Sequence, residues 1–544
     1  MNTRQLQTDK NQKLYHALLG ILLVCALAMM MLLSYWVCKY SYYGAVDGRT
    51  RGVLVGDKTW AHIAVFLAAS LCAMGIDKVL MKKDKSQQEK ICLCTLIVTS
   101  VIAFILGVFY VCKNPYYPVG DQINTTAFAA YCRDGNFSML SIGGYVGMYQ
   151  QQKGLAILYE ILFTLFGDFN YRPAKILHVV WWILTILAGY GFLKLNTDRP
   201  VFRMLYCVMM LGCFPLLFYL PYIYGDVLSI SFGIILFYGV AAYEHSGQKR
   251  YIALASFAAG LAVLARKNTW IVLVAVAVYV LLVSLRKKKV RYLMAGTAIL
   301  LTAALSVKAV DVIYEVRSGY PSGVGIPSIL WVAMGLQETE GRAGVYNRYQ
   351  QATFTDYDCQ QELAAQQGKE YIRERLEEFS QDPGMAFNFF KNKVEGQWIE
   401  PMYAALESTE SFEEGAELSP VLESLYYGEL GRTIWKLTNY YQSILYLAGL
   451  MALVMLGILW WKKKEVPISL WLPWIAVFGG FLFSILWEAK SRYVFPYCVF
   501  MILYAPEGLY QTGLLLCKLP KLRKFKKSGH TQDKGEEASL RETA

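Results

Sequence analysis

Residues 14–37 read LYHALLGILLVCALAMMMLLSYWV, a run of 24 residues that contains no Asp, Glu, Lys or Arg. The hydrocarbon core of a bilayer is about 30 Å thick, so a helix needs roughly 20 apolar residues to cross it. The run is long enough to do so, and no small-residue cleavage site follows it. It therefore predicts a retained membrane span and not a removed signal peptide.

The composition of the whole chain agrees with this stretch. Of 544 residues, 56% are apolar, 15% are aromatic and only 17% are charged. A soluble globular protein has about 45–50% apolar and about 25% charged residues. The apolar residues are also concentrated in runs that Lys/Arg clusters separate. These features exclude a soluble enzyme, a disordered chain, a disulfide scaffold and a nucleic-acid-binding protein.

The apolar runs predict an all-α polytopic membrane protein with about twelve transmembrane helices. Only helices and closed barrels satisfy their backbone polar groups in lipid, and these runs are too long for barrel strands. We expect the spans at 14–37, 60–81, 91–112, 176–194, 203–220, 226–243, 251–265, 269–285, 291–310, 437–460, 467–486 and 493–512.

The formal net charge of +12 is interpreted first as topology. Cytoplasmic loops carry an excess of Lys and Arg. The clusters between the predicted spans fall on one side if both termini are cytoplasmic, which predicts a multi-pass protein of the cell membrane. The run 154–166 is the exception, because counting it as a crossing would reverse every later cluster. We interpret it as a short interfacial or re-entrant helix.

The spans divide the chain into five parts. Residues 1–90 hold two additional N-terminal transmembrane helices, and 91–310 form the main transmembrane module with an outer loop at 113–175 that contains the interfacial helices. Residues 311–436 form a small helical extracytoplasmic segment. Residues 437–512 form the C-terminal transmembrane helices, and 513–544 a basic cytoplasmic tail.

Several cations depart from the rule that Lys and Arg gather on the cytoplasmic side, because they lie at the outer ends of different spans. Ionisable residues at the membrane edge are costly and are often functional. Six of them share one predicted depth: Lys153, Arg172, Arg266, Lys267, Lys490 and Arg492. A group of cations favours a shared anionic ligand, and phosphate suits Arg because the guanidinium binds two oxygens at once. The ordinary explanation for any one of them is a side chain that reaches the interface.

Two carboxylates lie at the same predicted depth. Asp121 follows the turn Tyr117-Pro-Val-Gly120 and is the candidate general base beside a bound phosphate. A helix N-cap is its ordinary explanation. Asp226, which begins the predicted span 226–243, is the other.

The order and sidedness of these elements resemble the GT-C superfamily of integral-membrane glycosyltransferases, in particular the protein-mannosyltransferase and aminoarabinose-transferase-like branch of the bacterial cell envelope. The resemblance covers about 91–512. It rests on the following motifs: Asp121 at the start of the first outer loop, Tyr149-x-x-x-Lys153-Gly154, Arg172-Pro173, Ile326-Pro327 with Trp331 and Met334-Gly-Leu336, the stretch Phe389–Pro401, and Glu488-x-Lys490-x-Arg492-Tyr493-x-x-Pro496.

The resemblance implies transfer of a sugar, of the hexosyltransferase type and with inversion, from a polyprenyl-phosphate donor at the extracytoplasmic face. The acceptor is a glycan, a lipid or a protein of the cell envelope. By position, Asp121 is the catalytic base, while the donor phosphate is bound by Lys153, Arg172, Arg266, Lys267 and Arg492.

The sequence departs from the family at Asp121-Gln122, where many relatives have Asp-Glu. This departure weakens the case for a divalent metal, which stays an alternative that the sequence does not support, so no metal site and no other cofactor is predicted. The resemblance also implies a second carboxylate, for which Asp226 is the candidate and Glu338 or Glu340 in the long outer segment are alternatives. A membrane transporter and a lipid-linked glycan flippase or polymerase remain as alternative functions. A transporter is expected to have broken or polar helices at mid-membrane and often an inverted repeat, and we find neither pattern in the sequence.

Overall fold

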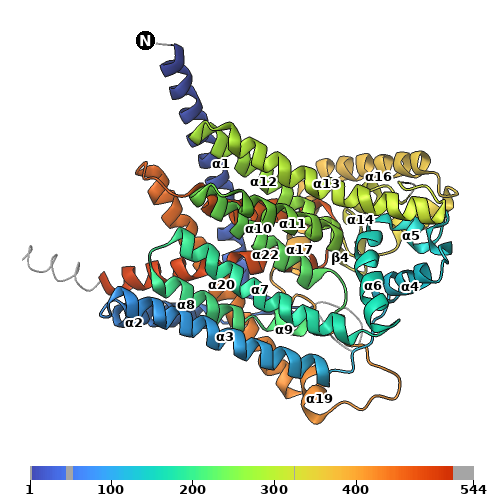
Figure 1. Ribbon diagram of the computed structural model, residues 1–544, viewed down its shortest axis with the longest axis horizontal. Helices are drawn as coiled ribbons and strands as arrows, with labels where there is room; N and C mark the ends of the chain where they lie inside the picture. The colour runs from blue at the N-terminus through green and yellow to red at the C-terminus, as the bar shows by residue number, and fades with distance from the viewer. Residues whose placement is uncertain (1–2, 44–52, 324, 519–544) are drawn as a thin grey trace, which may run out of the picture.

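The computed structural model describes residues 3–43, 53–323 and 325–518, and these residues form a helical bundle (Figure 1). Nine helical stretches among them are long and apolar enough to cross a membrane. They are α1 (Thr3–Lys39), α2 (Thr59–Leu80), α3 (Lys85–Lys113), α7 (Arg172–Asn196), α10 (Asp226–Ser246), η3 with α12 (Lys267–Thr269, Trp270–Lys287), α13 (Val290–Ser318), α20 (Glu429–Trp461) and η4 with α21 (Ile468–Trp471, Leu472–Leu486). The chain is therefore an all-α polytopic membrane protein, as its sequence predicts.

Three predicted spans correspond to short or broken helices in the structure. The span predicted at 203–220 is divided into α8 (Pro200–Leu211) and α9 (Phe214–Phe218), and α11 (Lys249–Ala265) has only 17 residues. The span predicted at 493–512 consists of α22 (Ser491–Met501) and helical residues 505–518, with a turn between them. The count of twelve crossings therefore stays a prediction.

None of the remaining described elements is a candidate membrane span. They are α4 (Asp121–Arg133), η1 (Ser138–Leu140), α5 (Tyr145–Met148), η2 (Gln150–Gln152), α6 (Lys153–Phe166), α14 (Ile329–Gly335), α15 (Tyr349–Asp356), α16 (Gln361–Gln381), α17 (Pro383–Trp398), α18 (Ala405–Ser408) and α19 (Pro420–Tyr427). Two antiparallel hairpins join β1 (Tyr40–Tyr43) to β2 (Val53–Gly56), and β3 (Glu338–Thr339) to β4 (Arg342–Ala343).

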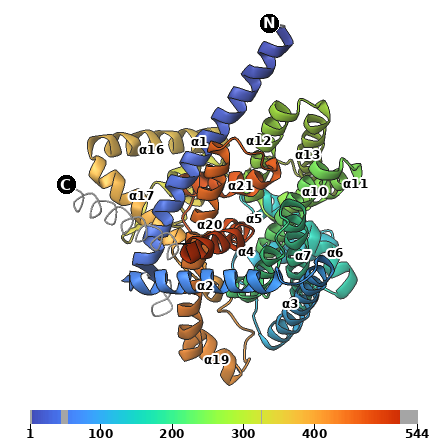
Figure 2. The ribbon, with the colours of Figure 1, turned by 90° about the vertical axis from the view of Figure 1, so that its left-hand side faces the viewer.

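The core of the bundle surrounds α10, which is buried along most of its length between α7 and α11. The helix α1 packs along α20, and α12 packs along α21 (Figure 2). The helices α4, α5, α6, α14 and α16 gather at one end of the bundle, which we call the α4 end (Figure 1). The 14-residue α6, predicted as an interfacial helix, packs there against α4.

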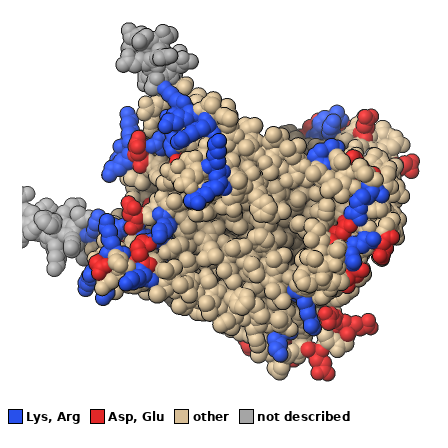
Figure 3. All heavy atoms as spheres, viewed as in Figure 1, with Lys and Arg blue, Asp and Glu red and all other residues tan. Residues whose placement is uncertain are grey.

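Charged side chains gather at the two ends of the molecule on the face drawn in Figure 3, and the band between them is almost free of charge. This distribution is the one expected of a protein whose middle lies in hydrocarbon. Most of the predicted basic tail, 519–544, lies outside the described residues.

Candidate functional site

A cavity of about 980 Å³ opens at the α4 end of the bundle. Segments from most of the chain meet there: the start of α4, the loop before α10, the turn between α11 and α12, and the loop before α22. Its charged and phenolic lining residues are Tyr42, Asp121, Tyr145, Tyr149, Tyr222, Tyr224, Arg266, Lys267, Arg342, Tyr346, Arg348, Glu400, Glu407, Glu488, Lys490, Arg492 and Tyr493. The cavity thus holds both carboxylates and cations at one end of the membrane-spanning helices.

Asp121 is the first residue of α4, and its carboxylate is exposed to this cavity. The residue before it, Gly120, has φ of 59°, a conformation that suits glycine, and forms the N-cap without a side-chain hydrogen bond. The Asp121 carboxylate therefore does not cap its own helix. It accepts a hydrogen bond of 2.8 Å from the Tyr145 hydroxyl and one of 3.5 Å from the Tyr224 hydroxyl.

Tyr224 connects this carboxylate to the cations of the site. Its hydroxyl accepts a hydrogen bond of 2.5 Å from Gln152 Nε2 while it faces Asp121. Its ring lies 5.2 Å from the guanidinium carbon of Arg266 and 5.3 Å from that of Arg492. Both distances are within the range of cation–π contacts. One tyrosine thus touches the candidate base and both arginines.

Arg266 and Arg492 share one buried carboxylate, Asp226, which is 2% exposed. Arg266 forms an ion pair with Asp226, and Arg492 Nε lies 4.0 Å from the same oxygen. Arg492 also donates a hydrogen bond to the hydroxyl of Tyr222. Since two guanidinium groups face one carboxylate, the cluster keeps a surplus of positive charge beside the cavity.

Asp226 lies behind the arginines and does not line the large cavity. Its place suggests that it positions Arg266 and Arg492, whereas the sequence offered it as a second carboxylate of the site. Glu338 and Glu340, the alternatives, belong to the β3–β4 hairpin and its turn and line none of the cavities described here.

Lys153 lies outside the large cavity. It is 2% exposed, forms an ion pair of 2.5 Å with Asp311 and donates a hydrogen bond of 2.8 Å to Ser322 Oγ. It lines a smaller neighbouring cavity of about 370 Å³. Lys267 lines both cavities and donates a 3.4 Å hydrogen bond to Ser328.

Arg172 is exposed at the start of α7 and lines neither of these two cavities. Its neighbour Lys175 is buried instead and donates a hydrogen bond of 2.7 Å to the carbonyl of Tyr116. The structure thus brings together Asp121, Arg266, Lys267 and Arg492, and leaves Lys153 and Arg172 apart from them.

Three carboxylates that line the large cavity are not among the site residues predicted from the sequence. Burial raises the pKa of Glu488 to about 7, although Lys490 opposes the shift. Burial also raises the pKa of Glu400 to about 7, against hydrogen bonds from the amides of Met402 and Ala404. Both residues stand in stretches quoted for the family resemblance, so attention to every acid in those stretches would have found them. The third, Glu407, carries no such signal.

These residues permit acid–base chemistry next to an anion. Burial, Tyr224 and Asp121 hold the pKa of Tyr145 well above its usual range, so its hydroxyl stays a hydrogen-bond donor to Asp121. Among the described residues, no group of three or more His, Cys, Asp or Glu is arranged to hold a metal ion. The chemistry that the residues themselves offer is a carboxylate base opposite paired guanidinium groups.

Comparison with protein-family models, curated proteins and solved structures gives no match for this chain.

Proposed function

We propose that this protein is a glycosyltransferase of the GT-C type that transfers a sugar from a polyprenyl-phosphate donor to a hydroxyl of a cell-envelope acceptor. In this proposal the α4 end faces the extracytoplasmic side and both termini are cytoplasmic. The acceptor is a glycan, a lipid or a protein.

The observation that carries the proposal is the contact of Tyr224 with Asp121 on one side and with Arg266 and Arg492 on the other. A transferase of this kind needs a base for the acceptor hydroxyl and positive charge for the leaving phosphate within the length of one sugar. The shared tyrosine places both requirements in one cavity.

The reaction follows from these parts. Asp121 takes the proton of the acceptor hydroxyl while the hydroxyl oxygen forms a bond to the anomeric carbon of the donor sugar. The bond between that carbon and the phosphate oxygen breaks on the opposite face, which inverts the anomeric centre. The leaving group is a lipid phosphate, and the surplus positive charge of Arg266 and Arg492 stabilises the negative charge that develops on it.

The placement of charge supports transfer over transport. A transport path needs polar groups near the middle of the membrane. The charged residues of this site stand at helix ends: Asp121 and Asp226 begin α4 and α10, and Arg266 directly follows α11.

The test is the variant Asp121→Asn, compared with Asp134→Asn at the other end of α4. Asp134 is exposed and does not line the cavity, so it provides a matched loss of charge on the same helix. Purified variants in detergent are incubated with a panel of polyprenyl-phosphate hexoses that carry a labelled sugar, together with a membrane extract as acceptor source. We expect Asp121→Asn to lower the transfer rate by about 10²- to 10⁴-fold, because a positioned base contributes this much, and Asp134→Asn to leave the rate within twofold.

Equal transfer by wild type and Asp121→Asn would rule out the role of Asp121. Movement of intact labelled donor across proteoliposomes, without transfer by wild type, would show a flippase instead.

A further inference from the structure

The second largest of the cavities described here, of about 670 Å³, lies at the end of the bundle opposite the α4 end, and we call it the second cavity. Three helices connect the two ends. The segments η3–α12 and η4–α21 each line the large cavity at one end, with Lys267 and the residues just after Leu486, and this second cavity at the other, with Arg286 and Trp471. The helix α10 begins at Asp226 and reaches the second cavity with Glu244.

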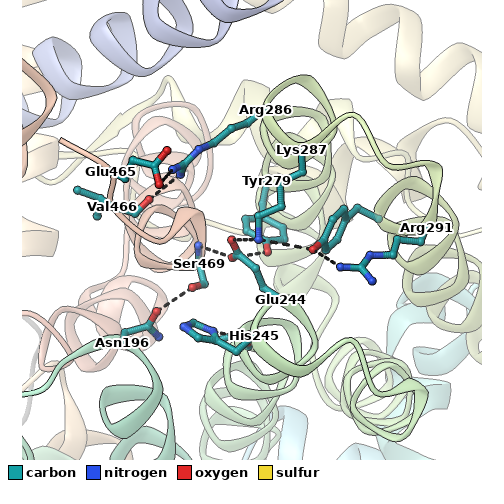
Figure 4. A network of polar contacts seen from close by, with 12 residues as sticks. Asn196, Glu244, His245, Tyr279, Arg286, Lys287, Arg291, Glu465, Val466 and Ser469 are labelled. Carbon is teal, nitrogen blue, oxygen red and sulfur yellow. Dashed lines mark hydrogen bonds and ion pairs between the residues drawn. The ribbon is translucent and has the colours of Figure 1, made fainter. Parts of the chain in front are cut away.

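The wall of this cavity is a fixed network of polar contacts (Figure 4). The Glu244 carboxylate forms an ion pair of 2.9 Å with Lys287. It also accepts hydrogen bonds from the Tyr279 hydroxyl and the Ser469 amide. Arg286 donates a hydrogen bond of 2.7 Å to the carbonyl of Val466 and lies 3.5 Å from Glu465. The charges of Glu244 and Lys287 therefore neutralise each other, and this pair adds no net charge to the cavity.

Three more lysines line the cavity, and their charges are not neutralised by an ion pair among the described residues. Lys288, Lys463 and Lys464 are exposed, and none of them forms an ion pair with an acidic residue among the side chains that the structure describes. The cavity is lined by five Lys or Arg residues but only two Glu. Its surplus charge is therefore positive and available.

Two of these lysines occupy left-handed backbone positions at helix ends, where glycine is the usual residue. Lys288 and Lys463 follow the ends of α12 and α20 with φ of 49° and 52°, in the left-handed region. Helices often end on a residue of this conformation, and glycine adopts it without strain. Loop lysines that only set topology or balance a helix end have no need of this strained backbone. Two strained lysines at one cavity point to a function for their ammonium groups.

Most of the remaining wall is apolar, although Gln12, His16 and His245 also line it. The helix α1 contributes Tyr15 and Leu19, and α20 contributes Leu456 and Trp460. The Trp460 indole donates a hydrogen bond of 3.2 Å to the carbonyl of His16, which holds the two helices together. The cavity thus combines a basic rim at the helix ends with an apolar wall that continues into the membrane-spanning part of the same helices.

We propose that this cavity binds the phosphate headgroup of an anionic phospholipid from the leaflet opposite the α4 end. Lys288, Lys463 and Lys464 contact the phosphate, and the first acyl carbons lie against Tyr15, Leu19 and Leu456. Basic pockets between transmembrane helices are typical sites for such headgroups. A soluble phosphate compound would use the lysines but not the apolar wall.

The experiment compares two double variants of the full-length protein in detergent. Lys288→Gln/Lys463→Gln removes two lysines that line the cavity, and Lys289→Gln/Lys462→Gln removes their immediate neighbours, which do not line it. Dioleoyl phosphatidylglycerol is titrated, and its binding is measured by native mass spectrometry and by the shift of the unfolding midpoint. Dioleoyl phosphatidylcholine and inorganic phosphate serve as the other two probes.

We expect wild type and the Lys289/Lys462 variant to bind phosphatidylglycerol alike, within twofold. The Lys288/Lys463 variant should bind it about 30-fold more weakly, since each basic residue near a membrane surface contributes about a factor of five. Lys288→Arg/Lys463→Arg should restore binding. If the double glutamine variant does not fold, Lys464→Gln alone should weaken binding about fivefold with both helix ends unchanged.

Equal loss in both glutamine variants would overturn the proposal, because it would show general surface attraction. Equal binding of phosphatidylcholine would overturn it too. An equal midpoint shift with millimolar inorganic phosphate would identify a soluble anion as the ligand instead of a lipid.

Discussion

At the scale of single residues, the two tyrosines on Asp121 differ in how closely they approach it. The Tyr145 hydroxyl lies 2.8 Å from one carboxylate oxygen and the Tyr224 hydroxyl 3.5 Å from the other. A hydrogen bond to a charged group contributes about 1.5–3 kcal/mol and weakens with distance. We expect Tyr145→Phe to lower kcat/KM for sugar transfer by about 10- to 100-fold, and Tyr224→Phe by less than tenfold. The reverse order, measured under the same conditions, would contradict this geometry.

Glu488 predicts a dependence of stability on pH. Its pKa is about 7 in the folded protein, against an ordinary value of 4.5, because the carboxyl is buried. Between these two values the folded chain holds a proton that the unfolded chain has lost, so stability falls as pH rises through this window. The loss amounts to at most about 3 kcal/mol. Glu488→Gln should therefore have an unfolding midpoint that falls less than that of wild type from pH 5 to pH 7.5, as measured by thermal unfolding in detergent. Identical slopes would contradict a raised pKa at this position.

Sidedness in the sequence predicts which residues share one membrane edge. Asp121, Arg266 and Arg492 share such an edge, and all three contact Tyr224 in the structure. The same reasoning groups Lys153 with them, but its side chain is buried against Asp311, which is distant in sequence. Depth along the membrane can be inferred from span boundaries, whereas the lateral partner of a side chain depends on helix packing, which the sequence does not display.

At the scale of elements, Gly225 controls how the start of α10 meets the end of α11. A β-carbon at this position would overlap the carbonyl oxygen of Ala265 and would lie 2.8 Å from Cγ of Arg266. Its backbone is in an ordinary conformation, with φ of −73°, so the close approach, and not the backbone conformation, requires glycine here. The close approach brings Asp226, the next residue, onto Arg266.

We therefore expect Gly225→Ala to destabilise the protein by about 1–3 kcal/mol, the usual effect of overpacking, and to lower sugar transfer as well. Thermal unfolding in detergent measures the first effect. Gly75→Ala is the control, because nothing lies within 4 Å of its added carbon in α2. A midpoint as low in Gly75→Ala as in Gly225→Ala would show that the close contact is not the cause.

The elements also show where hydropathy is a sufficient guide and where it is not. The span predicted at 14–37 lies within α1, and that at 437–460 lies within α20. The span predicted at 203–220 fails as one helix because Pro215 is the second residue of α9, and a proline there has no amide hydrogen to continue the preceding helix. Average hydropathy over a window is insensitive to such a break.

At the scale of the whole molecule, the charge-free band of Figure 3 and the two charged ends predict which residues are reached from each side of the membrane. Glu417 is exposed in the segment before α19, and Lys83 is exposed in the turn before α3. The helix α3 ends at Lys113, close to Asp121, so its beginning lies at the other end of the bundle.

In a chain whose 12 cysteines are replaced, a single cysteine at position 417 should react with an impermeant maleimide added to intact cells. A single cysteine at position 83 should react only after the cells are opened. Reaction of both positions from outside would contradict the predicted topology, and the opposite pattern would place Asp121 on the cytoplasmic side.

The segment of η3 and α12 between Lys267 and Lys287 lines the large cavity at one end and the second cavity at the other. The length of this segment therefore determines how the two cavities are oriented relative to each other. One residue added to an α-helix turns everything beyond it by 100° and moves it by 1.5 Å. An insertion in the middle of α12 would rotate Arg286 and Lys287 away from Glu244 and Val466 while Lys267 kept its place. The number of residues in the helix therefore fixes how its two ends are rotated relative to each other. We expect the middle of α12 to tolerate many substitutions but no insertion or deletion.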